Sequence, residues 1–99
     1  MSRELDEFIE EHVFGTPKAL IKALVNVPGW SSTGDGMLAV IEEMGRRNFW
    51  LNLEVGAHTS CAWFLSDAFG ETPVAECPTA PEAVARAAMA ALGGEAVSD

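Results

Sequence analysis

Two neighbouring segments of alternating apolar and polar residues constrain the fold of this chain more than any other feature. Residues 49–55 and 60–66 both alternate with a period of two, and only four residues, beginning with Gly56, separate them. Such alternation is typical of β-strands, and so short a connection joins antiparallel neighbours. The sequence therefore predicts a β-hairpin at the centre of the fold.

A third strand over 72–77 extends the predicted hairpin to a three-stranded antiparallel sheet. Simple pairing places Val55 opposite Ser60, and Ser66 opposite Thr72. One face then collects side chains that can form a core: Phe49, Leu51, Leu53, Val55, Ala62, Phe64 and Val74. The opposite face collects Trp50, Cys61, Trp63, Leu65, Ala75 and Cys77. That second face is too apolar to stay in water, so we expect a helix or another chain to cover it.

Apolar residues at spacings of three and four predict the helices that precede the strands. The first begins at Ser2 and ends at Gly15, and a second main helix runs from Thr33 to Arg46. A shorter helix is expected between them, within residues 17–27. All three have one apolar side, so each is expected to pack on the rest of the protein.

A final helix follows the strands. It begins at Thr79, which can form a capping box with Glu82, and it ends at the glycine pair 93–94. We expect an ordered core over about residues 3–93 and a frayed tail at 95–99. The prediction is a single α+β domain with main elements in the order α-α-β-β-β-α and helices packed on both faces of the sheet, as in an α/β/α sandwich.

Charge and hydropathy limit the partners and the location. Fifteen acidic residues against six basic ones give a formal net charge of −9. Because nucleic-acid affinity comes largely from Lys and Arg, we expect no direct binding to DNA or RNA. The chain begins without the features of a secretory signal, and no apolar stretch approaches the roughly 18 residues of a membrane span. We expect a cytosolic protein with no membrane association.

Four residues are of the types that bind zinc: His12, His58, Cys61 and Cys77. His58 and Cys61 have a usable spacing, but a paired Cys-x-x-Cys or His-x-x-x-His element is missing, so we expect no metal and no cofactor. In the predicted register Cys61 lies opposite Cys77, close to disulfide distance. In the cytosol two reduced, stacked thiols are the expectation, and a disulfide under oxidation is the alternative.

The sequence offers no recognisable catalytic group. Nucleophilic catalysis needs a base beside the nucleophile and donors for an oxyanion. The Ser and Thr residues lie in predicted caps and turns, and paired carboxylates such as Glu42 and Glu43 fall on exposed helix faces. We therefore expect no enzymatic activity.

Several segments together resemble a known family: residues 4–15, residues 27–33 leading into 37–44, and residues 70–76 with the closing Ala-rich helix. The family consists of small bacteriophage and prophage proteins known as the phage ABA sandwich domain, and the resemblance spans most of the chain. It implies a sheet covered by helices on both faces. It implies no activity and no site residue.

Our leading hypothesis is a non-catalytic phage accessory protein that binds a protein with a basic surface in the host cytoplasm. One such partner is a nucleic-acid-binding complex of host defence of the CRISPR type, which the protein would inhibit. The carboxylates of the first helix are then phosphate mimics, and the candidate contacts are Glu4, Glu7, Glu10 and Glu11, with Asp6 beside them. The alternative for these residues is a helix face that only keeps the protein soluble.

The second hypothesis is structural. Trp50, Trp63 and Leu65 would form an interface through which the protein forms a homodimer or docks on a virion or host component. The alternative is that the first helix and the segment 18–25 cover this face within the monomer.

Overall fold

The central hairpin forms as the alternation predicts. In the computed structural model, which describes residues 3–24 and 26–93, β1 (Phe49–Val55) pairs antiparallel with β2 (Ser60–Ser66). Val55 lies opposite Ser60, which is the predicted register. The Gly56 N–H donates to the Thr59 carbonyl at 2.8 Å and closes the turn.

The third strand differs from the prediction because a bulge divides it. Two short strands, β3 (Gly70–Glu71) and β4 (Ala75–Cys77), pair with the same side of β2. Three residues separate them, whereas only two residues of β2 separate their partners. Pro73 lies in this bulge, where its missing N–H breaks the ladder. Thr72 bridges the break, since its N–H donates to the Phe64 carbonyl and its Oγ1 accepts from the Phe64 N–H.

The extra residue shifts the register of β4 by one position. Cys77 lies opposite Ser60 and is buried, while Glu76 lies opposite Cys61. The predicted pairing of Cys61 with Cys77 is therefore wrong, and both cysteines are free thiols. A shift of one residue exchanges the faces of a strand, so Cys77 turns toward the core and Val74 is exposed.

The helices form in the predicted segments. The first helix consists of α1 (Arg3–Phe8) and a π-helical continuation, η1 (Ile9–Val13), and the others are α2 (Lys18–Ala23), α3 (Gly34–Arg46) and α4 (Ala80–Ala91). Gly15 ends the first helix in the left-handed conformation, with φ of 81°. Thr33 caps α3 by accepting from the Gly36 N–H at 2.9 Å. Thr79 precedes α4 without a side-chain capping bond, so the predicted capping box does not form.

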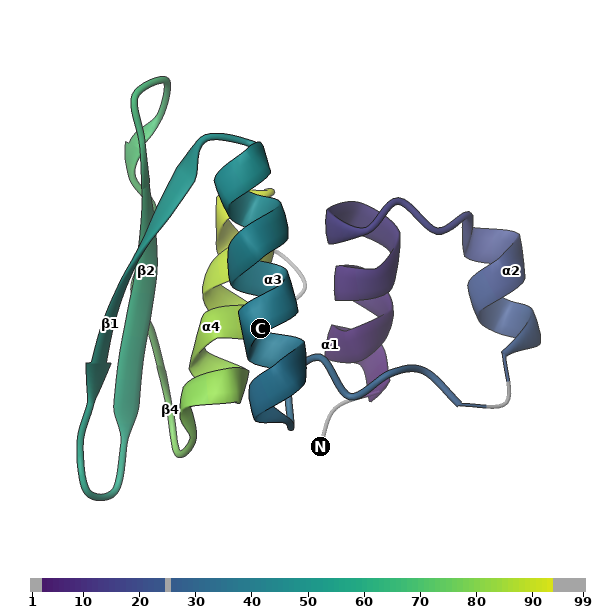
Figure 1. The fold of residues 1–99 in the computed structure, drawn as a ribbon, viewed down its shortest axis with the longest axis horizontal. Helices are drawn as coiled ribbons and strands as arrows, with labels where there is room; N and C mark the ends of the chain where they lie inside the picture. The colour runs from purple at the N-terminus through teal and green to yellow at the C-terminus, as the bar shows by residue number, and fades with distance from the viewer. Residues whose placement is uncertain (1–2, 25, 94–99) are drawn as a thin grey trace.

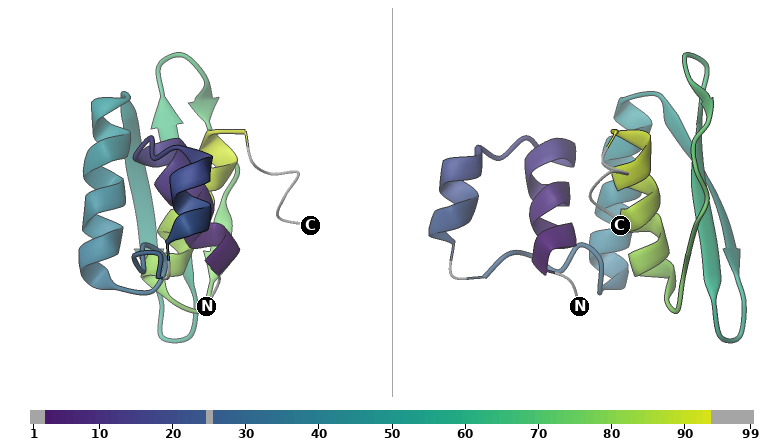
Figure 2. Two further views of the ribbon diagram at one scale, coloured as in Figure 1. Left: turned by 90° about the vertical axis from the view of Figure 1, so that its right-hand side faces the viewer. Right: turned by 180° about the vertical axis from the view of Figure 1, so that it is seen from behind.

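The helices stack on one side of the sheet (Figure 1). α3 lies over β1, and α4 lies over β2 and β4. The first helix packs behind α3 and α4, and α2 forms the outermost layer, as the second view in Figure 2 also shows. The α+β class is confirmed. The expected packing of helices on both faces is not seen, because the described helices leave the second face of the sheet uncovered.

The core lies between the covered face of the sheet and the first helix. Phe49, Ala62 and Phe64 of the sheet are buried there. α4 is buried almost all round because it lies between the sheet and the first helix, and its small alanine side chains permit close packing on both sides. None of the helices in residues 3–24 and 26–93 is long and apolar enough to cross a membrane.

The predicted domain spans residues 1–99, and the structure describes most but not all of them. Ser2, Val25, Gly94 and the tail at 95–99 lie outside the described residues.

Candidate functional site

The uncovered face of the sheet, here called the outer face, is the candidate site. It carries the side chains that alternate with the core residues: Trp50, Asn52, Glu54, Cys61, Trp63, Leu65, Glu71 and Glu76. Trp50 lies opposite Leu65, and Asn52 lies opposite Trp63, so two indoles and an isobutyl group share the middle of the face. The hairpin register alone fixes this arrangement, and the sequence predicted that part of it.

These apolar side chains stay in contact with solvent. Trp50 is 52% exposed, and Trp63, Leu65 and Cys61 are each half-buried by their neighbours in the sheet. Phe64, which follows Trp63 and points to the other side, is fully buried. Contiguous exposed apolar surface of this kind marks interaction sites in soluble proteins.

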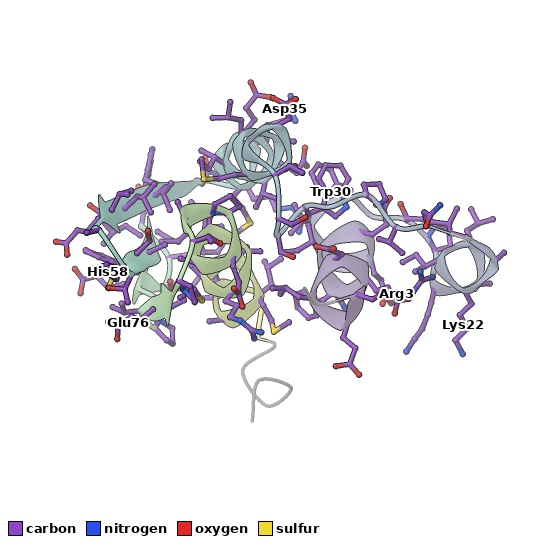
Figure 3. The ribbon with its side chains drawn as sticks, turned by 90° about the horizontal axis from the view of Figure 1, so that it is seen from below. Arg3, Lys22, Trp30, Asp35, His58 and Glu76 are labelled. Carbon is purple, nitrogen blue, oxygen red and sulfur yellow. The ribbon has the colours of Figure 1, made fainter. Side chains whose placement is uncertain are left out.

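The charged groups of the outer face are all acidic. Glu54 and Glu76 flank Cys61 at the hairpin end, and Glu71 lies opposite Leu65. The labelled basic residues lie elsewhere: in Figure 3, Arg3 and Lys22 are at the α1 and α2 end of the molecule, far from the sheet end with His58 and Glu76. The outer face therefore offers indole rings and carboxylates, a combination that suits Lys or Arg of a partner.

The acids of the first helix are placed differently from the prediction. Glu10 accepts hydrogen bonds from the Trp30 indole Nε1 at 2.8 Å and from the Thr16 hydroxyl. Asp6 accepts from the backbone N–H of Ser31 at 2.8 Å. Both carboxylates are turned toward the loop before α3, where they hold that loop to the first helix.

Two of the remaining acids of this helix have basic neighbours. Glu7 forms an ion pair with Arg3 at 2.8 Å, and Glu11 lies 3.6 Å from His12 Nε2. Glu4 is exposed. Thus Glu10, one of the four predicted acidic contacts, is engaged within the protein, and Glu7 and Glu11 have basic neighbours, whereas Trp50 and Trp63 lie on one face.

The loop before α3 makes structural contacts that the sequence analysis missed. Trp30 stacks on Phe14 with ring centroids 4.3 Å apart, and Figure 3 shows it beside the first helix. Gly36 permits the close approach, since a Cβ there would lie 2.8 Å from the Gly29 carbonyl oxygen and 2.8 Å from the Trp30 Cα. In the sequence this segment is only a run of turn-forming residues. No short-range pattern indicates that it would join α3 to the first helix.

The four residues considered for zinc lie apart. His12 is on the first helix and His58 is in the hairpin turn, while Cys61 is on the outer face and Cys77 is on the core side. Within residues 3–24 and 26–93, no group of three His, Cys, Asp or Glu residues is arranged to hold a metal ion. Burial raises the pKa of the Cys77 thiol, and the nearby Glu82 carboxylate raises it further.

A small cavity lies between β4 and α4. It has a volume of about 190 Å³ and is lined mainly by Val74, Ala75, Met89 and Ala90, with Arg86 beside them. Ligand pockets usually span about 300–1,000 Å³, so this cavity is small for a cofactor or substrate. Arg86 is also engaged within its own helix, where its Nε lies 3.2 Å from Glu82 Oε2.

Comparison with known proteins returned no relative. No family model matches the chain, and no similar protein was found among curated proteins or solved structures.

Proposed function

We propose that this protein acts by binding another protein through the outer face, without catalysis of its own. The observation that carries this proposal is the pair of tryptophans, exposed Trp50 and half-buried Trp63, on a sheet face that the described helices do not cover. Tryptophan is among the residues that dominate binding energy at protein interfaces. Leaving indole surface in contact with water has no benefit for the fold.

The partner that fits this face has an apolar patch bordered by Lys or Arg. Glu54, Glu71 and Glu76 surround the indoles, and none of the outer-face residues defined above is basic. The net charge of −9 acts in the same direction over a longer range, because it accelerates encounter with a basic protein. The proposal therefore keeps a basic partner but moves the contact from the first helix to the sheet.

The biological setting remains the one that the resemblance suggests. We propose a phage accessory protein, for which inhibition of a nucleic-acid-binding defence complex is one specific role. Such complexes have the basic grooves that an acidic surface can block. What favours the sheet over the first helix is that Asp6 and Glu10 are already used as acceptors within the protein.

Two triple variants with the same change in charge test this proposal. The first changes Glu54, Glu71 and Glu76 to Gln on the outer face, and the second changes Glu4, Glu7 and Glu11 to Gln on the first helix. Tagged protein captures partners from bacterial lysate at low and raised salt, and mass spectrometry identifies them. The association rate of each variant with the captured partner is then measured by surface plasmon resonance.

We expect the outer-face variant to associate about tenfold more slowly and to lose most of its salt dependence, while the helix variant changes little. Trp50→Ser should weaken affinity by about 30-fold, as for an interface hot spot. Leu20→Ser removes an exposed apolar side chain from α2 and serves as its control. If the helix variant had the larger effect, the outer face would not be the binding site and phosphate mimicry by the first helix would be restored.

A further inference from the structure

Among the strands that the structure describes, none pairs with one edge of the sheet, the free edge of β1. β1 is seven residues long and pairs with β2, and none of the described strands pairs with its other edge. The bond from the Gly56 N–H to Thr59 fixes which backbone groups point inward, because hydrogen-bonded and non-hydrogen-bonded pairs alternate along an antiparallel ladder. The backbone N–H and C=O groups of Phe49, Leu51, Leu53 and Val55 therefore point away from β2.

The two edges of the sheet differ in how they resist pairing with another chain. The opposite edge is divided into β3 and β4, and it contains Pro73 and a bulge. Short strands, proline and bulges are the usual devices that block edge-to-edge association. β1 has none of them: it contains no proline, no lysine and no bulge. An edge of this length without such protection is a template for a further strand.

We propose that the strand added to this edge is β1 of a second copy, which forms a symmetric homodimer. The two strands run antiparallel about a two-fold axis at Asn52, so that two four-stranded sheets become one. Leu51 then pairs with Leu53 of the other copy and uses the outward backbone groups, and Asn52 faces the same residue of its mate. The contact is made by backbone groups of the strand edge, so it does not require the outer-face function proposed above, although the two surfaces meet along β1.

The register is favoured by its side-chain neighbours. On the core side it places Phe49 opposite Val55 and Leu51 opposite Leu53, which are apolar matches. On the outer face it places Trp50 opposite Glu54, the one charged residue of β1, so that no like charges meet. Arg46, which ends α3 and pairs with Glu43 of its own helix, precedes the strand, so antiparallel pairing brings the Glu54 carboxylate toward the end of the other copy that carries this arginine.

Helix α3 supplies an independent indication of a second copy at this edge. It lies over β1, whereas α4 lies over β2 and β4, so the side of α3 away from α4 faces the same direction as the free edge. Leu38 lies near the middle of α3 and is 58% exposed. In the proposed dimer the two α3 helices flank the two-fold axis, and Leu38 of each is at about the level of Asn52. An exposed leucine on the helix that lies over the edge strand leaves apolar surface available to a second copy.

The first test is a charge placed on the two-fold axis. Asn52→Asp keeps the size of the side chain but sets two carboxylates directly opposite each other, while Asn26→Asp adds the same charge in an exposed loop far from β1. Sedimentation equilibrium at low and raised salt gives the dissociation constant of each. We expect the wild-type protein to dimerise, more tightly at raised salt because each copy carries −9. Asn52→Asp should raise the dissociation constant about tenfold at low salt, and Asn26→Asp should leave it within about twofold.

The second test is a cross-link that reads the register directly. In a Cys61→Ser background, Asn52→Cys should form an intermolecular disulfide on mild oxidation, since directly opposed non-hydrogen-bonded residues have Cα atoms about 4.5 Å apart. Glu54→Cys in the same background should not, because its mate lies four residues away along the strands. A protein that stays monomeric up to about millimolar concentration overturns the proposal. So does a dimer that Asn52→Asp does not weaken and that a cysteine at position 52 does not cross-link, because its copies then meet elsewhere.

Discussion

The two faces of the sheet are made of interleaved residues from the same strands, and both are apolar, yet the fold uses only one of them. On the covered face Phe49, Ala62 and Phe64 pack against α3, α4 and each other, with the two phenyl rings edge-to-face at 6.3 Å. On the outer face no helix within residues 3–24 and 26–93 lies over Trp50 and Trp63, so both keep contact with solvent. Apolar character alone therefore does not show which face a domain needs for its own stability.

The difference between the faces is one of free energy. Full burial of a large apolar side chain contributes about 1.5–3 kcal/mol relative to leaving it exposed. Phe64 gains this amount, whereas Trp50, which remains half exposed, gains much less. The outer face therefore retains apolar surface for a partner, chiefly on Trp50, whereas Phe64 on the covered face has none to offer.

The largest expected effect is on the free energy of unfolding, and it is tested at two adjacent residues that point to opposite faces. Phe64→Ala removes a fully buried ring and should lower the free energy of unfolding by about 3–5 kcal/mol. Trp63→Ala removes a larger but only partly buried side chain and should cost less, about 1–2 kcal/mol, because solvent can take part of its place. Urea denaturation followed by circular dichroism measures both.

Equal destabilisation by the two substitutions would contradict the comparison. It would mean that the outer face is covered in the folded protein, by a segment of the chain or by a second copy. Repeating the titration of Trp63→Ala at several protein concentrations separates these cases, since stability that depends on association changes with concentration.

Local sequence pattern was sufficient to predict the class of the fold and the hairpin. The strands over 49–55 and 60–66, their register and the limits of α3 all agree with the structure, because alternation, a short turn and the Thr33 cap act over a few residues. The third strand was misplaced by one residue because a single bulge at Pro73 is enough to exchange its two faces.

Interactions between distant residues could not be predicted in this way. The acids of the first helix were expected to face a partner, but the acceptors Asp6 and Glu10 contact Ser31 and Trp30, which are 25 and 20 residues away. Periodicity shows that a helix has an apolar and a polar side, and it does not show which layer each helix joins. For the same reason the sequence predicted covering helices on both faces, where the structure places them on one.

The second prediction concerns the stability contributed by α3, which packs on the covered face, and by the loop before it. Gly36→Ala adds a Cβ that would lie within 3 Å of the Gly29 carbonyl oxygen and the Trp30 Cα, so the loop must move away from α3. We expect a loss of about 1–3 kcal/mol, the usual cost of overpacking. Gly34→Ala is the matched control at the start of the same helix, where an added Cβ meets nothing, and it should leave stability unchanged within about 0.5 kcal/mol or raise it slightly. If both substitutions had the same effect, the contact between loop and helix would not contribute to the layer behind the sheet.

The smallest expected effects concern the reactivity of the two cysteines, which lie on opposite faces of the sheet, and the pH dependence of stability. Cys61 is half-buried on the outer face, whereas Cys77 is buried on the core side, and burial raises its pKa above the usual value of about 8.5. A thiol reagent should therefore label the native protein rapidly at one cysteine and reach the second only on unfolding, and Cys61→Ser should abolish the rapid phase. Because the folded state holds the Cys77 proton to higher pH than the unfolded state does, stability should be fully present below about pH 8.5 and fall as the pH rises above it. Cys77→Ala should remove that decline while Cys61→Ser keeps it. Equal labelling rates for the two thiols would place them in similar surroundings and return β4 to the unbulged register, in which both cysteines share the outer face.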